Sequence, residues 1–167
     1  MGETARELTC RCGKVRCQAR GEPILSAVCY CDDCQEGGHR IEAQTGAAKV
    51  MDADGGTPYL AFRDDRFECV AGKELLIGQQ LKPNSPTQRF VASCCQTAMY
   101  VKFAPGFWVS AYRHRFTGDV PALEWRNQTR FRVSDLPMPD DLPTYRRFPL
   151  RLFSRLAAAR VAMFLRR

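Results

Sequence analysis

The strongest constraint on the fold of this chain is a run of three cysteines, Cys29, Cys31 and Cys34, spaced two and three residues apart. Zinc prefers thiolate ligands at ~2.3 Å in a tetrahedral shell, and one tight turn can supply several of them. Other parts of the chain must then come to meet the same metal. The run therefore predicts a zinc site, and we expect metal and thiols, more than any one helix or strand, to organise the fold.

Seven of the nine cysteines lie in three short clusters. The clusters are Cys10 and Cys12, then Cys29, Cys31 and Cys34, and finally Cys94 and Cys95. A structural zinc takes four protein ligands and a catalytic zinc keeps one position open, so the seven divide into four and three. The prediction is one structural zinc on Cys10, Cys12, Cys94 and Cys95, and a second zinc on the other three, which is catalytic if its fourth position is open. Cys17 and Cys69 fall outside the clusters and are predicted to be small buried hydrophobes.

Charge is unevenly distributed along the chain. The formal net charge is +7, and seven arginines follow residue 144, where no acidic residue occurs. Residues 1–144 are therefore balanced in charge, which argues against a nucleic-acid footprint spread over the fold. The start of the chain is polar and lacks the apolar stretch of a signal peptide, so we expect a cytoplasmic protein whose cysteines are reduced metal ligands.

Short segments with strand character follow one another through most of the chain, separated by turn residues. They are residues 7–12, 14–20, 24–29, 57–62, 67–70, 74–78, 88–92, 97–103 and 107–112. Many short strands at close spacing predict a mainly β, antiparallel architecture. Residues 35–56 carry several glycines and are expected to form a mobile loop over the metal, with a short helix near 41–44 as the alternative.

The predicted organisation has three parts. Residues 1–116 form the zinc-binding β domain, 117–144 an irregular proline-rich extension, and 145–167 a basic C-terminal helix whose arginines exclude an easy membrane span. One apolar side of that helix is expected to consist of Leu150, Phe153, Ala157, Val161, Phe164 and Leu165. Three roles stay open for it: docking on the body, pairing with a second copy in a homodimer, or lying on an anionic membrane surface.

Two stretches carry a resemblance to a known family. Residues 9–16, which contain Cys10 and Cys12, and the run from Cys29 to Cys34 resemble the glutathione-dependent formaldehyde-activating enzyme (GFA) family, which also includes centromere protein V. The sequence looks like a divergent bacterial branch of that family. The resemblance implies a zinc-bearing β-tent fold, in which the Cys-x-Cys motif holds a structural zinc and the Cys-x-Cys-x-x-Cys motif a catalytic one.

The third motif departs from the family pattern. The family has Cys-x-x-Cys-Gly-Thr, and this chain has Ala92-Ser93-Cys94-Cys95-Gln96-Thr97, so Ala92 stands where a ligand is expected. Neighbouring side chains of an extended strand point to opposite faces. Cys94 and Cys95 therefore reach one metal only if the backbone turns between them; if it stays extended, Cys95 joins the structural site and Cys94 faces elsewhere.

A three-thiolate zinc has a formal charge of −1 and is a weak Lewis acid, so it suits a thiol substrate better than activation of water. The sequence therefore predicts a carbon–sulfur lyase acting on a small thiol or thiol adduct, as the family resemblance also implies. The alternative is a non-catalytic zinc module that binds a partner or a membrane surface. His39 is the candidate acid or base; the other interpretations are a fourth zinc ligand and a surface residue. Trp108 is expected in the core, or else partly exposed beside the site.

Overall fold

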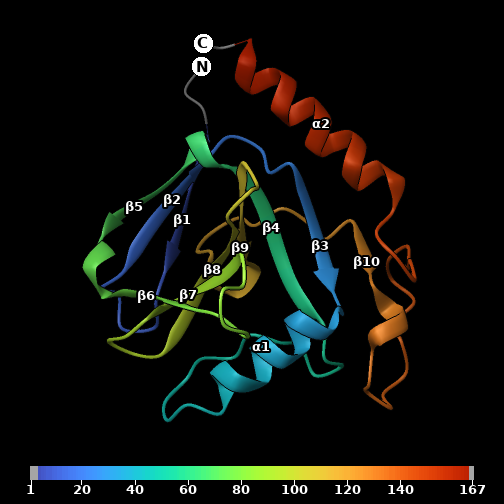
Figure 1. The fold of residues 1–167 in the computed structure, drawn as a ribbon, viewed down its shortest axis with the longest axis horizontal. Helices are drawn as coiled ribbons and strands as arrows, with labels where there is room; N and C mark the ends of the chain where they lie inside the picture. The colour runs from blue at the N-terminus through green and yellow to red at the C-terminus, as the bar shows by residue number, and fades with distance from the viewer. Residues whose placement is uncertain (1–3, 166–167) are drawn as a thin grey trace.

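The computed structural model describes residues 4–165, which form two β-sheets and two α-helices (Figure 1). The smaller sheet has the order β1-β2-β5, with β1 at Ala5–Thr9, β2 at Arg16–Arg20 and β5 at Phe67–Ala71. The larger sheet has the order β10-β3-β4-β9-β8-β7-β6. Its strands are β3 (Leu25–Cys29), β4 (Thr57–Arg63), β6 (Leu76–Gln79), β7 (Thr87–Ala92), β8 (Thr97–Phe103), β9 (Trp108–Tyr112) and β10 (Trp125–Asn127). The helices are α1 (Asp32–Glu42) and α2 (Leu150–Phe164), with single 3-10 turns at Asp64–Arg66, Lys73–Leu75, Arg113–Arg115 and Thr129–Phe131.

The predicted β architecture is confirmed, because each of the nine expected strand segments overlaps an observed strand. All neighbouring strands pair antiparallel except β10, which pairs parallel with β3. Leu8 of β1, Phe62 of β4 and Met99 of β8 belong to one fully buried cluster to which both sheets contribute. The two sheets therefore share a core, and the ends of their strands can bring distant cysteines together.

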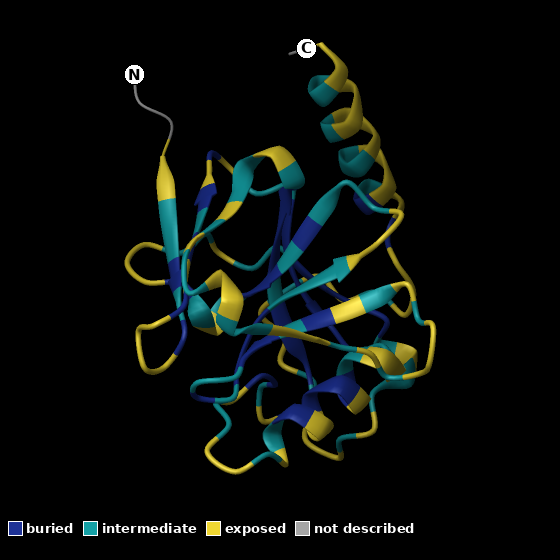
Figure 2. Cartoon of the chain, turned by 60° about the vertical axis from the view of Figure 1, so that its left-hand side comes forward, coloured by how far each residue is buried: buried dark blue, intermediate teal, exposed yellow. Residues whose placement is uncertain are grey.

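The glycine-rich segment after the cysteine run is not the loop that its composition predicts. Residues 32–42 form α1, and the helix buries Gly37 and Gly38 against the larger sheet (Figure 2). A β-carbon at Gly37 would collide with the Arg89 side chain, and one at Gly38 would collide with Met51. These glycines serve close helix packing, which a count of glycines cannot distinguish from chain flexibility.

The proline-rich extension also contributes to the sheet. Residues 125–127 form β10, whereas the sequence predicts irregular structure throughout 117–144. Trp125 is fully buried, and its backbone pairs with Ala27 of β3. Burial of this tryptophan explains why the strand forms. The sequence pattern does not predict the strand, because three residues are too few for a recognisable alternation.

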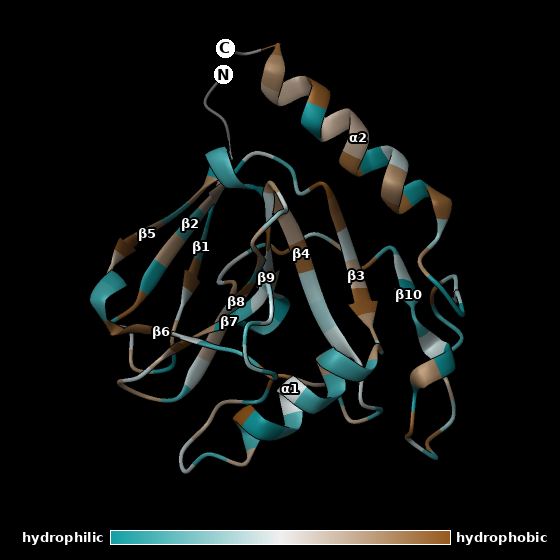
Figure 3. Ribbon diagram, in the orientation of Figure 1, coloured by the Kyte–Doolittle hydropathy of each residue, from teal (hydrophilic) through white to brown (hydrophobic). Residues whose placement is uncertain are grey.

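The predicted C-terminal helix is confirmed as α2, but its docked side differs from the expected one. Leu150, Phe153, Val161, Phe164 and Leu165 are exposed to solvent, whereas Leu152 and Leu156 pack on the body. Figure 3 shows that hydrophobic and hydrophilic positions are interspersed along α2. The arginines explain the difference: the Arg151 guanidinium lies 4.1 Å from the centroid of the Trp125 ring, and Arg155 pairs with Glu124 at 2.5 Å. Arg166 and Arg167 of the predicted basic tail lie outside the described residues.

Replacing Gly37 with alanine tests the packing of α1. Alanine is the better helix former by about 0.5–1 kcal/mol, but overpacking costs about 1–3 kcal/mol, so we expect a net loss of about 1 kcal/mol in the free energy of unfolding. Denaturant titration of the metal-loaded protein measures the change. His39→Ala, at an exposed position of the same helix, is the control and should stay within about 0.5 kcal/mol. A Gly37→Ala protein as stable as the unsubstituted one would contradict the close-packing explanation.

Candidate functional site

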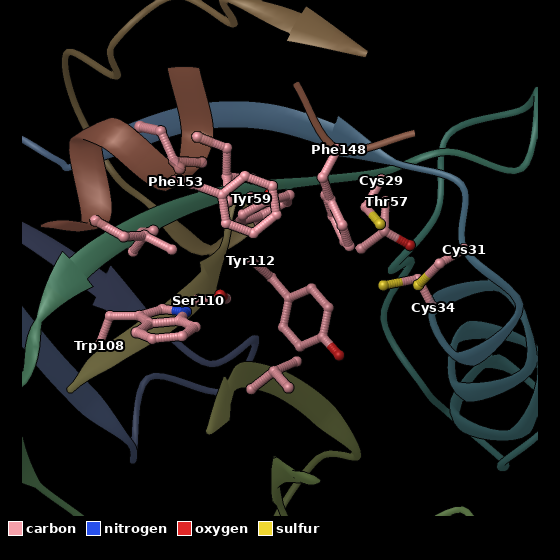
Figure 4. A pocket seen from close by; sticks show the side chains of 15 residues that line it. Cys29, Cys31, Cys34, Thr57, Tyr59, Trp108, Ser110, Tyr112, Phe148 and Phe153 are labelled. Atoms are coloured by element: carbon pink, nitrogen blue, oxygen red, sulfur yellow. The ribbon is translucent and has the colours of Figure 1, made fainter. Parts of the chain in front are cut away.

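The three-cysteine cluster forms where a strand ends and a helix begins. Cys29 is the last residue of β3, Cys31 directly precedes α1, and Cys34 lies in the first turn of α1. The Cys34 and Gln35 amides both donate to the Cys31 carbonyl, at 3.0 and 3.1 Å, which fixes this turn. The three sulfur atoms lie within 4.8 Å of one another and point together at one end of a cavity (Figure 4). Among residues 4–165 no histidine, acidic residue or further cysteine joins the group.

The thiols of this cluster interact strongly. Hydrogen bonding with Cys29 and Cys34 lowers the pKa of Cys31 to about 3, and the same contacts raise the pKa of Cys29. Three adjacent sulfurs therefore favour one thiolate before any metal binds. Thiolate sulfur is the donor that a soft divalent ion prefers, so the donor set fits a metal ion.

Arg89 of β7 supplies a positive charge beside the cluster. Its side chain is 4% exposed and donates a hydrogen bond to the Asp33 carbonyl in the first turn of α1. Its charge also favours the thiolate forms of Cys31 and Cys34. No carboxylate of the described residues forms an ion pair with it, unlike the buried Arg63, which pairs with Asp65. A buried charge needs a partner, and here the thiolates provide one.

A cavity of about 310 Å³ opens beside the three sulfurs (Figure 4). Its walls come from β3, β4, β8, β9 and the C-terminal segment, and no charged residue of the described chain lines them. The aromatic lining residues are Tyr59, Trp108, Tyr112, Phe148 and Phe153, and the aliphatic ones are Leu25, Ala61, Val101, Leu152 and Leu156. Burial raises the pKa of the Tyr59 and Tyr112 hydroxyls, which keeps both protonated at neutral pH. Trp108 is partly exposed and borders the cavity, so it lies beside the site and not in the core.

The second cluster joins Cys10, Cys12, Cys94 and Cys95, whose sulfurs all lie within 4.8 Å of one another. The Cys10–Cys12, Cys10–Cys94, Cys12–Cys94 and Cys94–Cys95 sulfur distances are 3.6, 3.9, 3.3 and 3.8 Å. A tetrahedral ion with metal–sulfur bonds of ~2.3 Å has its sulfurs ~3.8 Å apart. The cluster therefore fits a four-coordinate metal ion.

The backbone turns that the third motif requires are present. Residues 93–96 form a turn between β7 and β8, and Gln96 adopts a left-handed φ of 50°. Cys94 and Cys95 consequently reach the same cluster although Ala92 cannot act as a ligand. Burial opposes ionisation of Cys95, but the Thr97 hydroxyl, 3.1 Å away, helps to lower its pKa to about 6. On the other side, Cys10 accepts a hydrogen bond of 3.2 Å from the Val15 amide, within a knuckle in which the Gly13 amide also donates to the Cys10 carbonyl.

His39 lies on the exposed side of α1. It belongs to neither cysteine group and does not line the cavity. Its role as acid or base stays a prediction.

Sequence reasoning missed two parts of the site. One is Arg89, which lies on the same face of β7 as the buried Val91. A charged residue at an inward position of a strand was the signal that could have identified it. The other is the wall formed by Phe148, Leu152 and Leu156, which follow a linker and carry no motif. Only tertiary structure places that wall at the cavity.

The fold and the two clusters define a mainly β protein with two cysteine sites that could each hold a metal ion. The model of the family described as glutathione-dependent formaldehyde-activating enzyme matches residues 5–113. The chain belongs to this family. A crystal structure of a Rhodobacter sphaeroides protein is similar at 17% identity and a TM-score of 0.48, covering 69% of this chain and 91% of that one. A comparison with curated proteins finds no match.

Replacing Arg89 with leucine tests the charge balance of the three-cysteine site. Without the cation, three thiolates and a divalent ion leave a buried negative charge uncompensated, so we expect about 10–100-fold weaker metal binding there. Titration with cobalt(II), followed by its thiolate absorption bands, measures the affinity. Arg63→Leu removes another buried arginine, at the far end of β4 from Thr57, and should leave cobalt binding unchanged. Equal losses in both variants would refute the proposed role of Arg89.

Proposed function

We propose that this protein is a zinc-dependent carbon–sulfur lyase that makes or breaks the bond between a small thiol and a carbonyl carbon. The observation that supports it best is the three-cysteine cluster, which has no fourth protein ligand in the described chain and borders a cavity. In the forward direction a thiol sulfur bonds to the carbonyl carbon, the π electrons of the carbonyl move to its oxygen, and the proton lost by the thiol ends on that oxygen. The reverse reaction releases thiol and carbonyl compound, and neither direction needs an oxidant.

Zinc bound by Cys29, Cys31 and Cys34 would hold the substrate sulfur and lower its pKa, which is the chemistry a thiolate site supplies. Arg89 balances the negative charge of the site from the side of β7. The Tyr59 and Tyr112 hydroxyls border the cavity and stay protonated, so they are the proton donors available to a substrate oxygen. The Thr57 hydroxyl beside Cys29 has no hydrogen-bond partner among the described residues, and an oxygen adjacent to the substrate sulfur would give it one.

The four-cysteine cluster has a different role in this proposal. Its four thiols close the coordination shell, which is typical of structural zinc. Such a site contributes apparent folding free energy of ~10–16 kcal/mol in small zinc domains. It would therefore stabilise the junction of the two sheets, and the alternative of a purely structural zinc module applies to this cluster only.

Thiol binding by the cobalt-substituted protein tests the lyase proposal. We expect an added thiol to change the cobalt absorption bands and the protein to accelerate equilibration of that thiol with an aldehyde, followed by nuclear magnetic resonance. Cys34→Ser should lower the acceleration by at least about tenfold, because it removes one ligand. Cys69→Ser, outside both clusters, is the matched control and should keep both properties. Cobalt bands indifferent to every thiol tested would sink the proposal.

A second candidate function is binding to an anionic membrane surface through α2. The exposed apolar residues Leu150, Val161 and Phe164 recur at helical spacing along one side of α2. Exposed Arg146, Arg147 and Arg160 accompany them, and no acidic residue follows position 144. A homodimer through this side would bring like charges together, whereas anionic lipids complement them. No helix in residues 4–165 is long and apolar enough to span a membrane.

Binding to vesicles measures this second function. Replacing Val161 and Phe164 with aspartate removes apolar contact and adds negative charge, so we expect about tenfold weaker binding to phosphatidylserine-containing vesicles in a sedimentation assay. Val70→Asp, at an exposed apolar position of β5, should bind as the unsubstituted protein does. Equal binding by all three proteins would end the membrane hypothesis.

A further inference from the structure

We propose that the three-cysteine site selects an apolar thiol adduct, aromatic or branched-alkyl, over a charged one, and that the C-terminal segment outside the family domain sets this preference. The inference rests on the proposed function, because it names the substrate class of the same site.

The walls of the cavity cannot solvate a charged substrate. Apart from the cysteines, the polar groups of the described lining residues are the hydroxyls of Thr57, Ser110 and two tyrosines and the indole N–H of Trp108, and none of these residues is charged. Glutathione carries two carboxylates and an ammonium group, and burial of an unpaired charge costs several kcal/mol. An apolar thiol instead gains about 25 cal/mol for each Å² of its surface that leaves water. The walls therefore favour an apolar group on the substrate sulfur.

The cavity runs away from the sulfurs toward Trp108. Figure 4 shows the three sulfurs at one end, the Trp108 ring at the other, and the rings of Tyr59 and Tyr112 between them. A substrate sulfur held at the cysteines would thus direct its carbon chain between two aromatic rings. The volume of about 310 Å³ lies at the small end of the range of ligand pockets, which fits a compact substituent.

One wall of the cavity belongs to the C-terminal segment. Phe148, Leu152, Phe153 and Leu156 line the cavity, and all four follow Arg113, where the family match ends. Leu152 is buried, while Phe148 and Phe153 are 40% and 54% exposed and so form the rim. The segment is held in place because Arg151 stacks on Trp125 and Arg155 pairs with Glu124. One apolar wall of the cavity therefore lies outside the GFA domain, whereas the other apolar lining residues belong to it.

The test compares two thiols on the full-length, cobalt-loaded protein. The probes are 2-phenylethanethiol and glutathione. The readouts are the cobalt absorption bands and the fluorescence of Trp108, which is assigned by its loss in the Trp108→Phe variant. We expect half-saturation by 2-phenylethanethiol at a concentration at least about tenfold lower than by glutathione. Ethylbenzene, which has no thiol, should shift the fluorescence of Trp108 without changing the cobalt bands.

A matched pair of variants on α2 locates the preference. Phe153→Asp places a charge on the cavity rim. It should weaken the binding of 2-phenylethanethiol about tenfold and have little effect on the binding of glutathione. Phe164→Asp changes a residue of similar exposure, 58%, that does not line the cavity, and should change neither. Because both positions are exposed, neither variant should unfold the protein.

The outcomes separate this inference from the proposed function. Equal half-saturation by the two thiols, or no fluorescence response to ethylbenzene, overturns the inference while a cobalt response to thiol keeps the proposed function. An ethylbenzene response with cobalt bands that no thiol changes overturns the proposed function, although the apolar cavity stands. Equal effects of Phe153→Asp and Phe164→Asp overturn the role of the C-terminal segment.

Discussion

The convergence of thiols at strand ends is the constraint on which the rest of the structure depends. Adjacent side chains of a strand point to opposite faces, and side chains two residues apart stand ~6.6 Å apart. Sulfurs close in sequence therefore come within ~3.8 Å of one another only where the backbone leaves the sheet. The chain leaves it at the knuckle around Gly13, at the turn ending with Gln96, and between β3 and α1. The first two of these meet in the four-cysteine cluster although 82 residues separate Cys12 from Cys94. Metal at that cluster would fasten the two sheets together.

The three-cysteine cluster depends on electrostatic balance as well as on geometry. Arg89 lies in the interior because it faces thiolates and the Asp33 carbonyl, and Gly37 leaves the room that its guanidinium needs. Helix α1, strand β7 and the site are therefore coupled: a larger residue at position 37 disturbs packing and charge together. This coupling accounts for the glycine at position 37 of the helix beside the three cysteines.

The C-terminal extension gives the site its surroundings. Strand β10 anchors the extension to β3, and α2 then covers the cavity with Leu152 and Leu156. The same helix exposes Leu150 and Phe164 to solvent. One helix thus lines the cavity with some apolar residues and exposes others. In the proposed function, the GFA domain would supply the sulfur chemistry and the extension would select the substrate.

The sequence by itself determined the nine strands of its predicted β domain, the C-terminal helix and the grouping of Cys29, Cys31 and Cys34. Strand alternation and cysteine spacing are local signals, so they can be recognised in the sequence alone. Tertiary structure alone decided that Cys94 and Cys95 share a cluster, that residues 32–42 are helical, and which side of α2 docks. Each of these depends on contacts between distant segments: a left-handed residue that turns the backbone, glycines that allow close packing, and arginines that find Trp125 and Glu124. Arg89 and the apolar cavity belong with them, because a charge or an apolar residue acquires its role only from what is packed against it.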